Sequence, residues 1–590
     1  MPELSVIIRT YNRRTRLRRC LEGLVRQTAA HEDFEVVVVV DGSSDGSLAM
    51  LEGLEPSFSM RVVVQENQGA NIAFNRGIRE ATGEWCLFLD DDIEPHAGLV
   101  EAHLRVQREN DGVVGIGKLI MKIPAPSDWF HRGMVKSWEA HYQALDRRDR
   151  PPTWQDCFGG NFSAPRSALA EAGGAAEDMP RSHDVELGYR LQRAGLGFVY
   201  IPTAVGEQNE RKDFRELAAD YERSGEGWVR LVEKHPELLP HVFGSFHHTR
   251  LLSAGLQRFG LMLSVSPRIL KRLLECVGKR DYRAFHFLRN YSYWRGVKRA
   301  IESRDQWKRL TGGTRILMYR GFSADPADAG RSLVAGKRLR EQLTWLQRFG
   351  FKVLSLEEYL EIRRANELPP ARAVVITIDD GYRDVLTVAA PILASHDVPA
   401  TVFLVSDRIG GANDWGQDSE LRGRPLVFSE DLGILAEHGL TFGAHTRTHP
   451  DLTSLDPTKV RAEIEGGKRK LSALVGYEVR TFAYPYGAVS DPVRDVAEEV
   501  GFLGSCGIES GLNTVSTPLH ELRRIEVFGT DNLFRFLAKV WFGRTFSLGL
   551  DFGSRSAENE ARSFGRRLPH TWGRGTTADK ADDRGPRLAP

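Results

Sequence analysis

Two regions of this chain alternate buried strands with helices, and that alternation limits the folds it can adopt. From Leu4 to about Gly206, apolar runs such as "LSVIIRT", "FEVVVVVDG" and "EWCLFLDDD" are separated by polar segments with helical character. The same order returns from about Thr314 to Val540, where the runs include "TRILMY", "AVVITIDDG" and "LTFGAHT". Strands that are apolar along their whole length are typical of parallel sheets covered by helices on both faces. The predicted fold class is therefore α/β, with two separate, mostly parallel sheets.

Length and composition divide the chain further. Its 590 residues exceed what one hydrophobic core usually serves. The sequence between the two α/β regions is helical in character, and the sequence after about Asp551 turns polar and rich in Gly, Arg and Ser, as disordered segments do. We predict four segments: an α/β domain over 1–210, a helical connector over 211–312, an α/β domain over 313–550 and a disordered tail over 551–590.

Charge and targeting signals narrow the function classes. Lys plus Arg (80) nearly cancels Asp plus Glu (79), so no basic excess predicts nucleic-acid binding. Five cysteines without a C-x-x-C pair suit a reducing compartment. The chain opens on a strand rather than on a basic and apolar leader, and the stretch "LLSAGLQRFGLMLSV" is too short to span a bilayer. We predict a cytoplasmic protein, with the inner face of the membrane as an alternative location.

Aspartates follow two of the predicted strands in the first region. Asp41 ends "VVVVVD", and Asp90, Asp91 and Asp92 follow "CLFL". Ligands of open parallel sheets bind beyond the carboxyl ends of the strands, and carboxylates there suit Mg²⁺ or Mn²⁺ with a nucleotide's phosphates. Helix caps and turns explain either cluster equally well when it is taken alone.

Six motifs taken together resemble the family-2 glycosyltransferases with a GT-A fold. They are "SVIIRTYNRR", "VVVVVDGSSDGS", "NQGANIAFNRGI", "GEWCLFLDDDIEP", "GGNFSAPRSALAEAGG" and "SHDVELGYRLQRAG", and they cover about residues 4–206. The resemblance implies that Asp41 contacts the nucleoside base, that Asp90 and Asp92 form the D-x-D pair that holds Mg²⁺ or Mn²⁺ and the sugar nucleotide, with Asp92 a metal ligand, and that Asp184 is the catalytic base. Such a base on the face opposite the departing diphosphate gives inversion.

The first region also departs from this family. His183 stands where an acidic residue usually precedes the base, and a later histidine of the family is replaced near Glu207. The Q-x-x-R-W motif of processive synthases is missing, which disfavours a polymerase. A structural alternative for Asp184 is a cap at the start of a helix.

The second region holds an aspartate pair and a histidine pair. Asp379 and Asp380 lie in "TIDDGY" after an apolar run, and His445 and His449 lie in "FGAHTRTHPDL" after another. One carboxylate, two imidazoles and a position left for water make up a catalytic site for Zn²⁺ or another divalent transition metal. Adjacent aspartates then have separate tasks, because one binds the metal while its neighbour serves as base.

These motifs resemble the polysaccharide deacetylase family, with its NodB-homology domain, a distorted (β/α) barrel, over about residues 314–545. The resemblance implies that Asp379 is the general base and that Asp380, His445 and His449 hold the metal. It also implies a substrate groove in "TFAYPYGA". The groove residues are Tyr484, Pro485, Tyr486 and Gly487.

Three positions depart from the deacetylase pattern, and one backbone group is a further candidate. Ala483 and Tyr484 replace the arginine that many members carry in the third motif, and Arg320 replaces an early histidine. His520 is the candidate for the late histidine that serves as general acid. The Tyr486 backbone N–H is a candidate oxyanion donor by the same resemblance.

The connector segment Tyr282 to Ile301 mixes aromatic and basic residues. One interpretation is contact with an anionic membrane face near a lipid-linked acceptor. The favoured interpretation is a helix packed on the first domain. The sequence supports nucleic-acid binding by these residues less than it supports either of these two interpretations.

The sequence therefore predicts a bifunctional carbohydrate enzyme. It would transfer a sugar from a nucleotide sugar, with a UDP-sugar the favoured donor, to a glycan or lipid-linked acceptor. It would also remove the N-acetyl group of a sugar. One alternative is a transferase whose second domain is an inactive glycan-binding module, and another is a scaffold in a glycan-assembly complex.

Overall fold

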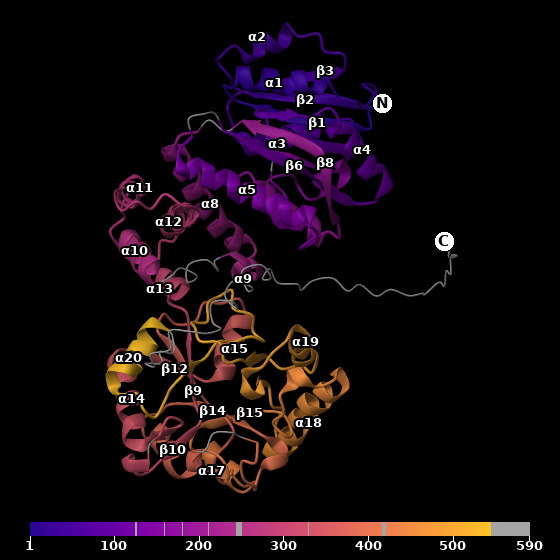
Figure 1. Ribbon diagram of the computed structural model, residues 1–590. Helices are drawn as coiled ribbons and strands as arrows, with labels where there is room; N and C mark the ends of the chain where they lie inside the picture. The colour runs from indigo at the N-terminus through magenta and orange to yellow at the C-terminus, as the bar shows by residue number, and fades with distance from the viewer. Residues whose placement is uncertain are drawn as a thin grey trace, which may run out of the picture. The chain divides into compact units, whose positions relative to one another are not determined.

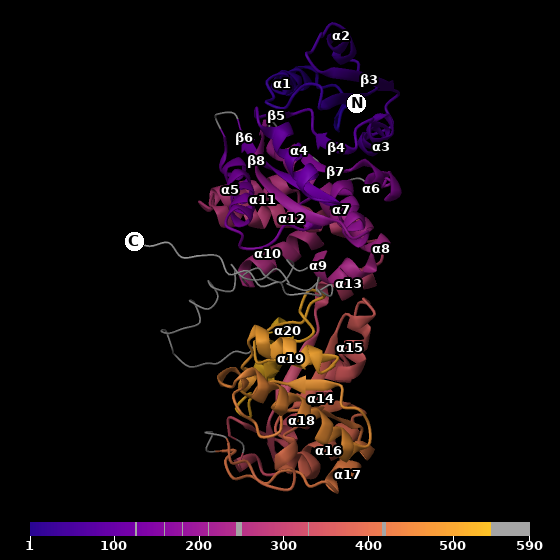
Figure 2. The same ribbon diagram turned by 90° about the vertical axis from the view of Figure 1, so that its right-hand side faces the viewer.

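The computed structural model describes most of the chain. The described residues are 1–123, 127–158, 160–179, 181–209, 212–242, 251–328, 330–415 and 420–543. The predicted tail over 551–590 lies outside them. Figure 1 shows the first sheet at the indigo to magenta end of the chain and the second sheet in orange and yellow, and Figure 2 gives the view turned by 90°.

The first α/β region forms an eight-stranded sheet in the order β3-β2-β1-β4-β7-β6-β8-β5. The strands are β1 (Leu4–Thr10), β2 (Phe34–Asp41), β3 (Ser59–Gln65), β4 (Trp85–Leu89), β5 (Ile93–Pro95), β6 (Val113–Lys122), β7 (Asn161–Pro165) and β8 (Gly197–Asn209). The helices are α1 (Arg14–Val25), α2 (Ser47–Glu52), α3 (Ala70–Glu80), α4 (Leu99–Glu109), α5 (Trp129–Asp146), α6 (Arg166–Glu171) and α7 (His183–Arg193).

Continuous apolar strands place this sheet in the middle of the domain. Every residue of β2 is buried, with Val38 opposite Ile8 of β1 and Val62 of β3. These pairings are parallel, as is that of β1 with β4, whereas β7 runs antiparallel to β4 and β6. The prediction of a mostly parallel sheet is confirmed.

The connector is helical throughout its described part. Its helices are α8 (Phe214–Lys234), α9 (Leu239–Val242), α10 (Leu251–Met262), α11 (Pro267–Cys276), α12 (Tyr282–Ala300) and α13 (Arg304–Gly312). Gly225 of α8 and Gly296 of α12 face backbone of the opposite helix and leave no room for a Cβ, so α8 and α12 approach closely. Phe285, Tyr291 and Trp294 of α12 are fully buried. The aromatic residues of Tyr282 to Ile301 therefore serve packing, which is the favoured interpretation.

The second α/β region forms a curled sheet in which every strand pairing is parallel, in the order β17-β16-β15-β14-β13-β9-β18 with β12 also beside β13. Its strands are β9 (Arg315–Tyr319), β12 (Lys352–Leu354), β13 (Ala373–Ile378), β14 (Ala400–Leu404), β15 (Leu440–Ala444), β16 (Thr481–Ala483), β17 (Gly504–Cys506) and β18 (Ile525–Glu526), and β10 (Gly321–Ser323) pairs with β11 (Leu333–Ala335). The helices are α14 (Gly336–Arg348), α15 (Leu356–Arg364), α16 (Ala390–Ser395), α17 (Asp431–Glu437), α18 (Pro457–Val475), α19 (Asp491–Glu499) and α20 (Leu533–Phe542).

The second domain was expected to be a distorted (β/α) barrel, and its curled parallel sheet forms a half-barrel. The predicted α/β fold class is confirmed for both regions. All six residues of β13 are buried. The core that packs against both faces of this strand therefore fixes the position of its carboxyl end. Among the described residues, no helix is both long enough and apolar enough to cross a bilayer.

Candidate active sites

The first site lies where β1, β2 and β4 end at one edge of the sheet. Asp41, the last residue of β2, is only 4% exposed. Its carboxylate accepts hydrogen bonds from Gln65 Nε2 (2.8 Å) and from the backbone amides of Gln68 (2.9 Å) and Gly69 (3.0 Å). Asp41 therefore ties the loop before α3 to the strand end, and its orientation is fixed before any ligand binds.

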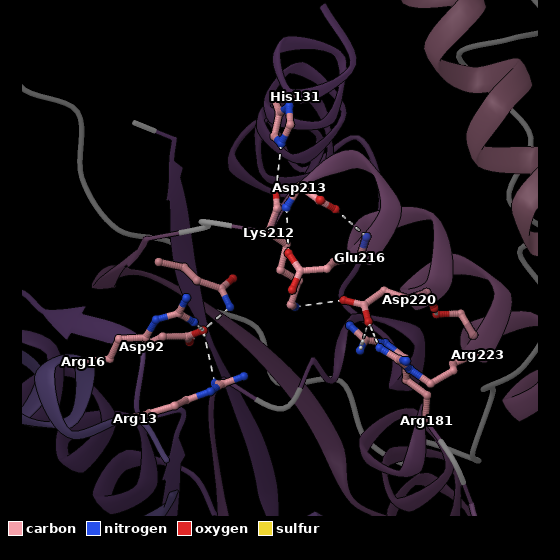
Figure 3. Close-up of polar contacts among 12 residues, drawn as sticks. Arg13, Arg16, Asp92, His131, Arg181, Lys212, Asp213, Glu216, Asp220 and Arg223 are labelled. Carbon is pink, nitrogen blue, oxygen red and sulfur yellow. Dashed lines mark hydrogen bonds and ion pairs between the residues drawn. The ribbon is translucent and has the colours of Figure 1, made fainter. Parts of the chain in front are cut away.

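Arginines from the segment after β1 surround the aspartates that follow β4. Arg13 donates to Asp91 at 2.9 Å. Asp92 accepts from Arg13 (3.5 Å) and Arg16 (3.4 Å), which Figure 3 shows around it, and it also accepts from Gln208 (3.3 Å). Burial raises the pKa of the Asp91 carboxyl to about 6, although Arg13 opposes this shift. Burial and then the nearby Asp90 raise the pKa of Asp92.

Sequence analysis assigned no role to these arginines. The pairing of β1 with β4 is the signal that could have revealed these arginines, because parallel neighbouring strands end at the same edge of the sheet. The carboxylates of Asp90 and Asp92 fit a divalent ion, since Mg²⁺ is commonly held by one or two carboxylates together with substrate phosphates.

Arg9 joins three loops of this site. Its guanidinium donates to Asp90 at 3.3 Å and to the carbonyl of Ala70 at 3.3 Å, and it lies 2.9 Å from His183 Nε2. Burial lowers the pKa of His183 to about 4, and Asp184 opposes this shift while Arg9 adds to it. A neutral His183 accepts the hydrogen bond from Arg9. The Arg9 side chain thus contacts both the D-x-D segment and the residue that precedes Asp184.

The loop before Asp184 is held by the connector helix α8. Asp220 of α8 forms ion pairs with Arg181 (3.5 Å), Lys212 (2.8 Å) and Arg223, all drawn in Figure 3. Gly227, also on α8, packs directly against the Arg181 backbone. The sequence left a cap at the start of a helix as a structural alternative for Asp184. Asp184 is not the N-cap residue of α7, because Ser182 occupies that position.

The second site contains three buried side chains that could hold a metal ion. Asp380 follows β13 and His445 follows β15, and Asp380 Oδ1 lies 3.6 Å from His445 Nε2 and 3.3 Å from His449 Nε2. One ligand atom from each residue lies within 4.8 Å of the others, and no other such group of three occurs among the residues that the structure describes. One carboxylate with two imidazoles fits Zn²⁺ or a similar divalent transition metal.

The surroundings orient these three side chains. His445 Nδ1 lies 2.7 Å from the Ala483 carbonyl, so Nδ1 carries the proton that is donated and Nε2 faces Asp380. Burial and then His449 lower the pKa of His445 to about 4. Burial also acts to raise the pKa of Asp380, but His449 and His445 outweigh it and hold that pKa at about 2. Asp380 and His449 have positive φ values of 72° and 66°, strained backbone of the kind that clusters at functional sites.

Asp379 does not join the metal ligands, because Arg524 holds it. Arg524 Nη1 donates to Asp379 Oδ1 at 2.6 Å, and both side chains are buried, at 2% and 9% exposed. Arg524 Nε donates to the Gly507 carbonyl at 2.8 Å, which fixes the guanidinium. Sequence analysis noted that the third-motif arginine is missing and did not find this one. Arg524 is 145 residues from Asp379 in the sequence. It directly precedes β18, which pairs with β9, and β9 pairs with β13, the strand that Asp379 follows.

Replacing Arg524 with glutamine should leave the buried carboxylate of Asp379 without its charged partner. We expect a loss of about 3–5 kcal/mol in the free energy of unfolding of this domain, because one partner of a buried ion pair would remain unpaired. Hydrogen exchange of the β13 and β18 amides at rising urea concentration measures this loss. The matched control is Arg523→Gln, since Arg523 makes a looser, more exposed pair with Glu509 at 3.7 Å. Equal stability of the two variants would contradict the assignment.

Of the four predicted groove residues, Tyr486 presents an exposed ring. Its ring is half exposed and stands edge-on to His449, with centroids 4.7 Å apart. Trp415 stacks on the same imidazole at 4.9 Å and accepts a hydrogen bond from the Tyr486 hydroxyl on its carbonyl at 3.3 Å. Tyr484 is fully buried and donates to the His520 carbonyl at 3.0 Å, and Pro485 is buried as well. The sequence motifs did not reveal Trp415 as a neighbour of His449 and Tyr486.

His520 lies against β17. Its Nδ1 is 3.1 Å from Ser505 Oγ, and burial lowers its pKa to about 4. Its described contacts include neither Asp379 nor a metal ligand. The sequence candidate for the late general acid is therefore not brought into the metal site.

Comparisons with known proteins match each of the two α/β regions to a family. Residues 5–173 match the model for glycosyl transferase family 2, and residues 366–504 match the model for polysaccharide deacetylase. The chain therefore joins a family-2 glycosyltransferase domain to a polysaccharide deacetylase domain, both of them enzyme families, and the two predicted resemblances are confirmed.

Relatives of each domain are known. The validoxylamine A glucosyltransferase of Streptomyces hygroscopicus subsp. jinggangensis (strain 5008) is 31% identical over 41% of this chain and 63% of its own length. The poly-β-1,6-N-acetyl-D-glucosamine N-deacetylase of Staphylococcus aureus (strain MRSA252) is 25% identical over 36% of this chain and 72% of its own. The solved Streptococcus pyogenes deacetylase PplD is 24% identical over 39% of this chain and 98% of its own, with a TM-score of 0.34. The match thus spans less than two thirds of the transferase relative.

Proposed function

We propose that this chain is a bifunctional enzyme that transfers a sugar with inversion from a nucleotide sugar to a glycan or lipid-linked acceptor and removes the N-acetyl group of an N-acetylated sugar. The observation that carries the proposal is the buried set Asp380, His445 and His449, with Asp379 held apart from it by Arg524. The name of the staphylococcal relative, an N-deacetylase of poly-N-acetylglucosamine, supports an N-acetylhexosamine substrate. The name of the Streptomyces relative supports a hexosyl donor, and we favour a UDP-sugar.

Sugar transfer would use the carboxylates at the edge of the first sheet. Asp41 would contact the nucleoside base, and Asp90 and Asp92 would hold Mg²⁺ or Mn²⁺, which offsets the charge of the departing diphosphate. Asp184 would accept the proton of the acceptor hydroxyl while that oxygen attacks C1 of the donor sugar. The C1–O bond to the diphosphate breaks on the opposite face, so the configuration at C1 inverts.

Deacetylation would use the two aspartates separately. A divalent ion held by Asp380, His445 and His449 would supply Lewis-acid polarisation. Asp379, oriented by Arg524, would take a proton from the attacking water, and the Tyr486 backbone N–H would stabilise the oxyanion. Asp379 would then pass this proton to the nitrogen as the C–N bond breaks, which yields acetate and an amine. Trp415 and Tyr486 would flank the sugar ring beside His449.

Tethering explains why the two activities would share a chain. The second domain meets a product of the first at a raised effective concentration. We place both reactions in the cytoplasm because nucleotide sugars are made there. The proposed domain limits are 1–210 for the transferase, 211–312 for the connector and 313–550 for the deacetylase. The connector links the two enzymes.

The full chain tests the proposal directly. With Mn²⁺ and a panel of nucleotide sugars, we expect nucleoside diphosphate release. With short N-acetylglucosamine oligomers, and with the transferase's own product, we expect acetate release. A protein that binds metal and releases no acetate from either would be a transferase with a glycan-binding module, which the position of His520 beside Ser505 favours. Failure of both assays would favour a scaffold.

A further inference from the structure

Helices α10 and α11 of the connector expose large apolar side chains. The exposed fractions are 55% for Phe259, 67% for Met262, 53% for Ile269, 53% for Leu273 and 67% for Val277. A helix on a protein surface usually turns polar residues outward. Exposed apolar area concentrated on two neighbouring helices marks an interaction site.

The inner faces of these helices are already occupied. Leu261 and Leu270 are each 2% exposed and belong to the core around α12. Figures 1 and 2 show α10, α11 and α12 as neighbours. Both helices are therefore apolar on two sides, and their inner residues pack in the core around α12 while the outer ones are exposed.

Helical spacing gathers the outer residues into stripes. Leu256, Phe259 and Leu263 follow one another at intervals of three and four, and Ile269, Leu273 and Val277 at intervals of four. Residues so spaced lie on one face of a helix. We call the two stripes together the α10–α11 surface, defined by Leu256, Phe259, Met262, Leu263, Ile269, Leu273 and Val277.

Cations lie beside the apolar stripe of α11. Arg268 and Arg272 each precede a stripe residue by one position, and Lys279 and Arg280 follow the helix; all four are exposed. The one acidic residue of α11, Glu275, pairs with Lys271 at 2.9 Å. The surface is thus apolar with a basic border, which calls for an anionic and apolar partner.

The charge also excludes two other occupants. Residues 544–590 contain nine Arg and Lys and six Asp and Glu, so this segment is itself basic. A second copy of the chain would bring the same basic border against this one. Both contacts would place like charges together, whereas a bilayer rich in anionic lipid offers opposite charge and apolar depth.

We propose that the α10–α11 surface binds a bilayer that contains anionic phospholipid, with its apolar side chains at the acyl boundary and its arginines at the phosphates. The chain would lie on the bilayer rather than span it. This assignment moves the membrane contact from Tyr282–Ile301, whose aromatic residues are buried or partly buried, to the preceding helix pair. Binding itself is independent of either reaction and would bring the transferase near a lipid-linked acceptor, which deepens the proposed function.

The cysteines supply a direct probe. Cys20, Cys86, Cys157 and Cys506 are buried, and Cys276 in the last turn of α11 is exposed. An environment-sensitive dye on Cys276 of the full chain should shift to the blue with phosphatidylcholine vesicles that contain phosphatidylglycerol. Co-sedimentation of unlabelled protein should agree, and both signals should weaken with salt. No binding to the anionic vesicles, or equal binding to pure phosphatidylcholine vesicles, overturns the proposal.

Matched variants assign the binding to the surface. Ile269→Glu with Leu273→Glu should weaken vesicle binding at least tenfold, and Arg268→Glu with Arg272→Glu should do so at low salt only. The control is Ile434→Glu with Leu474→Glu, exposed apolar residues of α17 and α18, which should bind as the wild type does. Nucleoside diphosphate release without vesicles checks that each variant is folded. Unchanged vesicle binding by the variant Ile269→Glu with Leu273→Glu overturns the proposal. A wild-type protein that is a dimer, and that this variant converts to a monomer, overturns it as well.

Discussion

Asp379→Asn is expected to keep the deacetylase metal and lose acetate release, whereas Asp380→Ala is expected to lose the metal itself. The structure gives the two neighbours different partners, Arg524 for Asp379 and the two histidines for Asp380. An amide cannot accept a proton from water, so the rate of acetate release should fall by about 10²–10⁴-fold in Asp379→Asn. A site with three protein ligands lacks redundancy, so His445→Ala should behave as Asp380→Ala does.

Elemental analysis of the purified variants measures the metal, and acetate release measures the activity. The matched control is Asp384→Asn in the same motif, because Asp384 accepts from the Phe322 amide and Arg424 and contacts no metal ligand among its described partners. It should keep the metal. Chelation of the wild type should lower the midpoint of thermal unfolding, since metal at 100 times its Kd stabilises the folded state by about 2.7 kcal/mol. Loss of metal from Asp379→Asn would show that Asp379 is a ligand and not a base.

Asp92→Ala is expected to abolish metal-supported binding of the nucleotide sugar, whereas Asp184→Asn is expected to spare binding and stop transfer. Asp92 lies among Arg13, Arg16 and Gln208 at the strand edge, where the donor diphosphate would bind. Asp184 is the second residue of α7 and follows His183, which contacts Arg9. Removal of a positioned base costs about 10²–10⁴-fold in rate.

Calorimetry with Mn²⁺ and nucleotide sugars separates these two variants. The control is Asp45→Ala, because Asp45 accepts hydrogen bonds from Ser47 at the start of α2 and from the Arg14 amide, and neither Asp92 nor Asp184 is among its described partners. A fragment that ends near Gly312 should bind donor as the full chain does, since the described contacts of the site come from the first sheet and from segments up to α8, all of which precede Gly312. No donor binding by that fragment, or loss of binding in Asp184→Asn, would contradict the proposed roles.

The sequence by itself determined the strands, the two α/β regions and the carboxylate and histidine motifs. Continuous apolar runs such as β2 and β13 have one stable placement, inside a covered parallel sheet, and the residue after such a run must then lie at the sheet edge. That is why Asp90, Asp379 and His445 could be placed at strand ends from the sequence alone. Each of these inferences depends on residues close together in the chain.

Tertiary structure decided which distant side chains meet these motifs. Arg524 reaches Asp379, Arg9 joins Asp90 to His183, and Trp415 stacks on His449, and in each case the order of strands and loops in space creates the contact. It also decided burial: Tyr484 turned inward although its motif suggested a groove, and α12 was covered while α10 and α11 were left exposed. Amphipathic spacing shows that a helix has an apolar face, but the free energy of burying that face is gained only where another element lies against it.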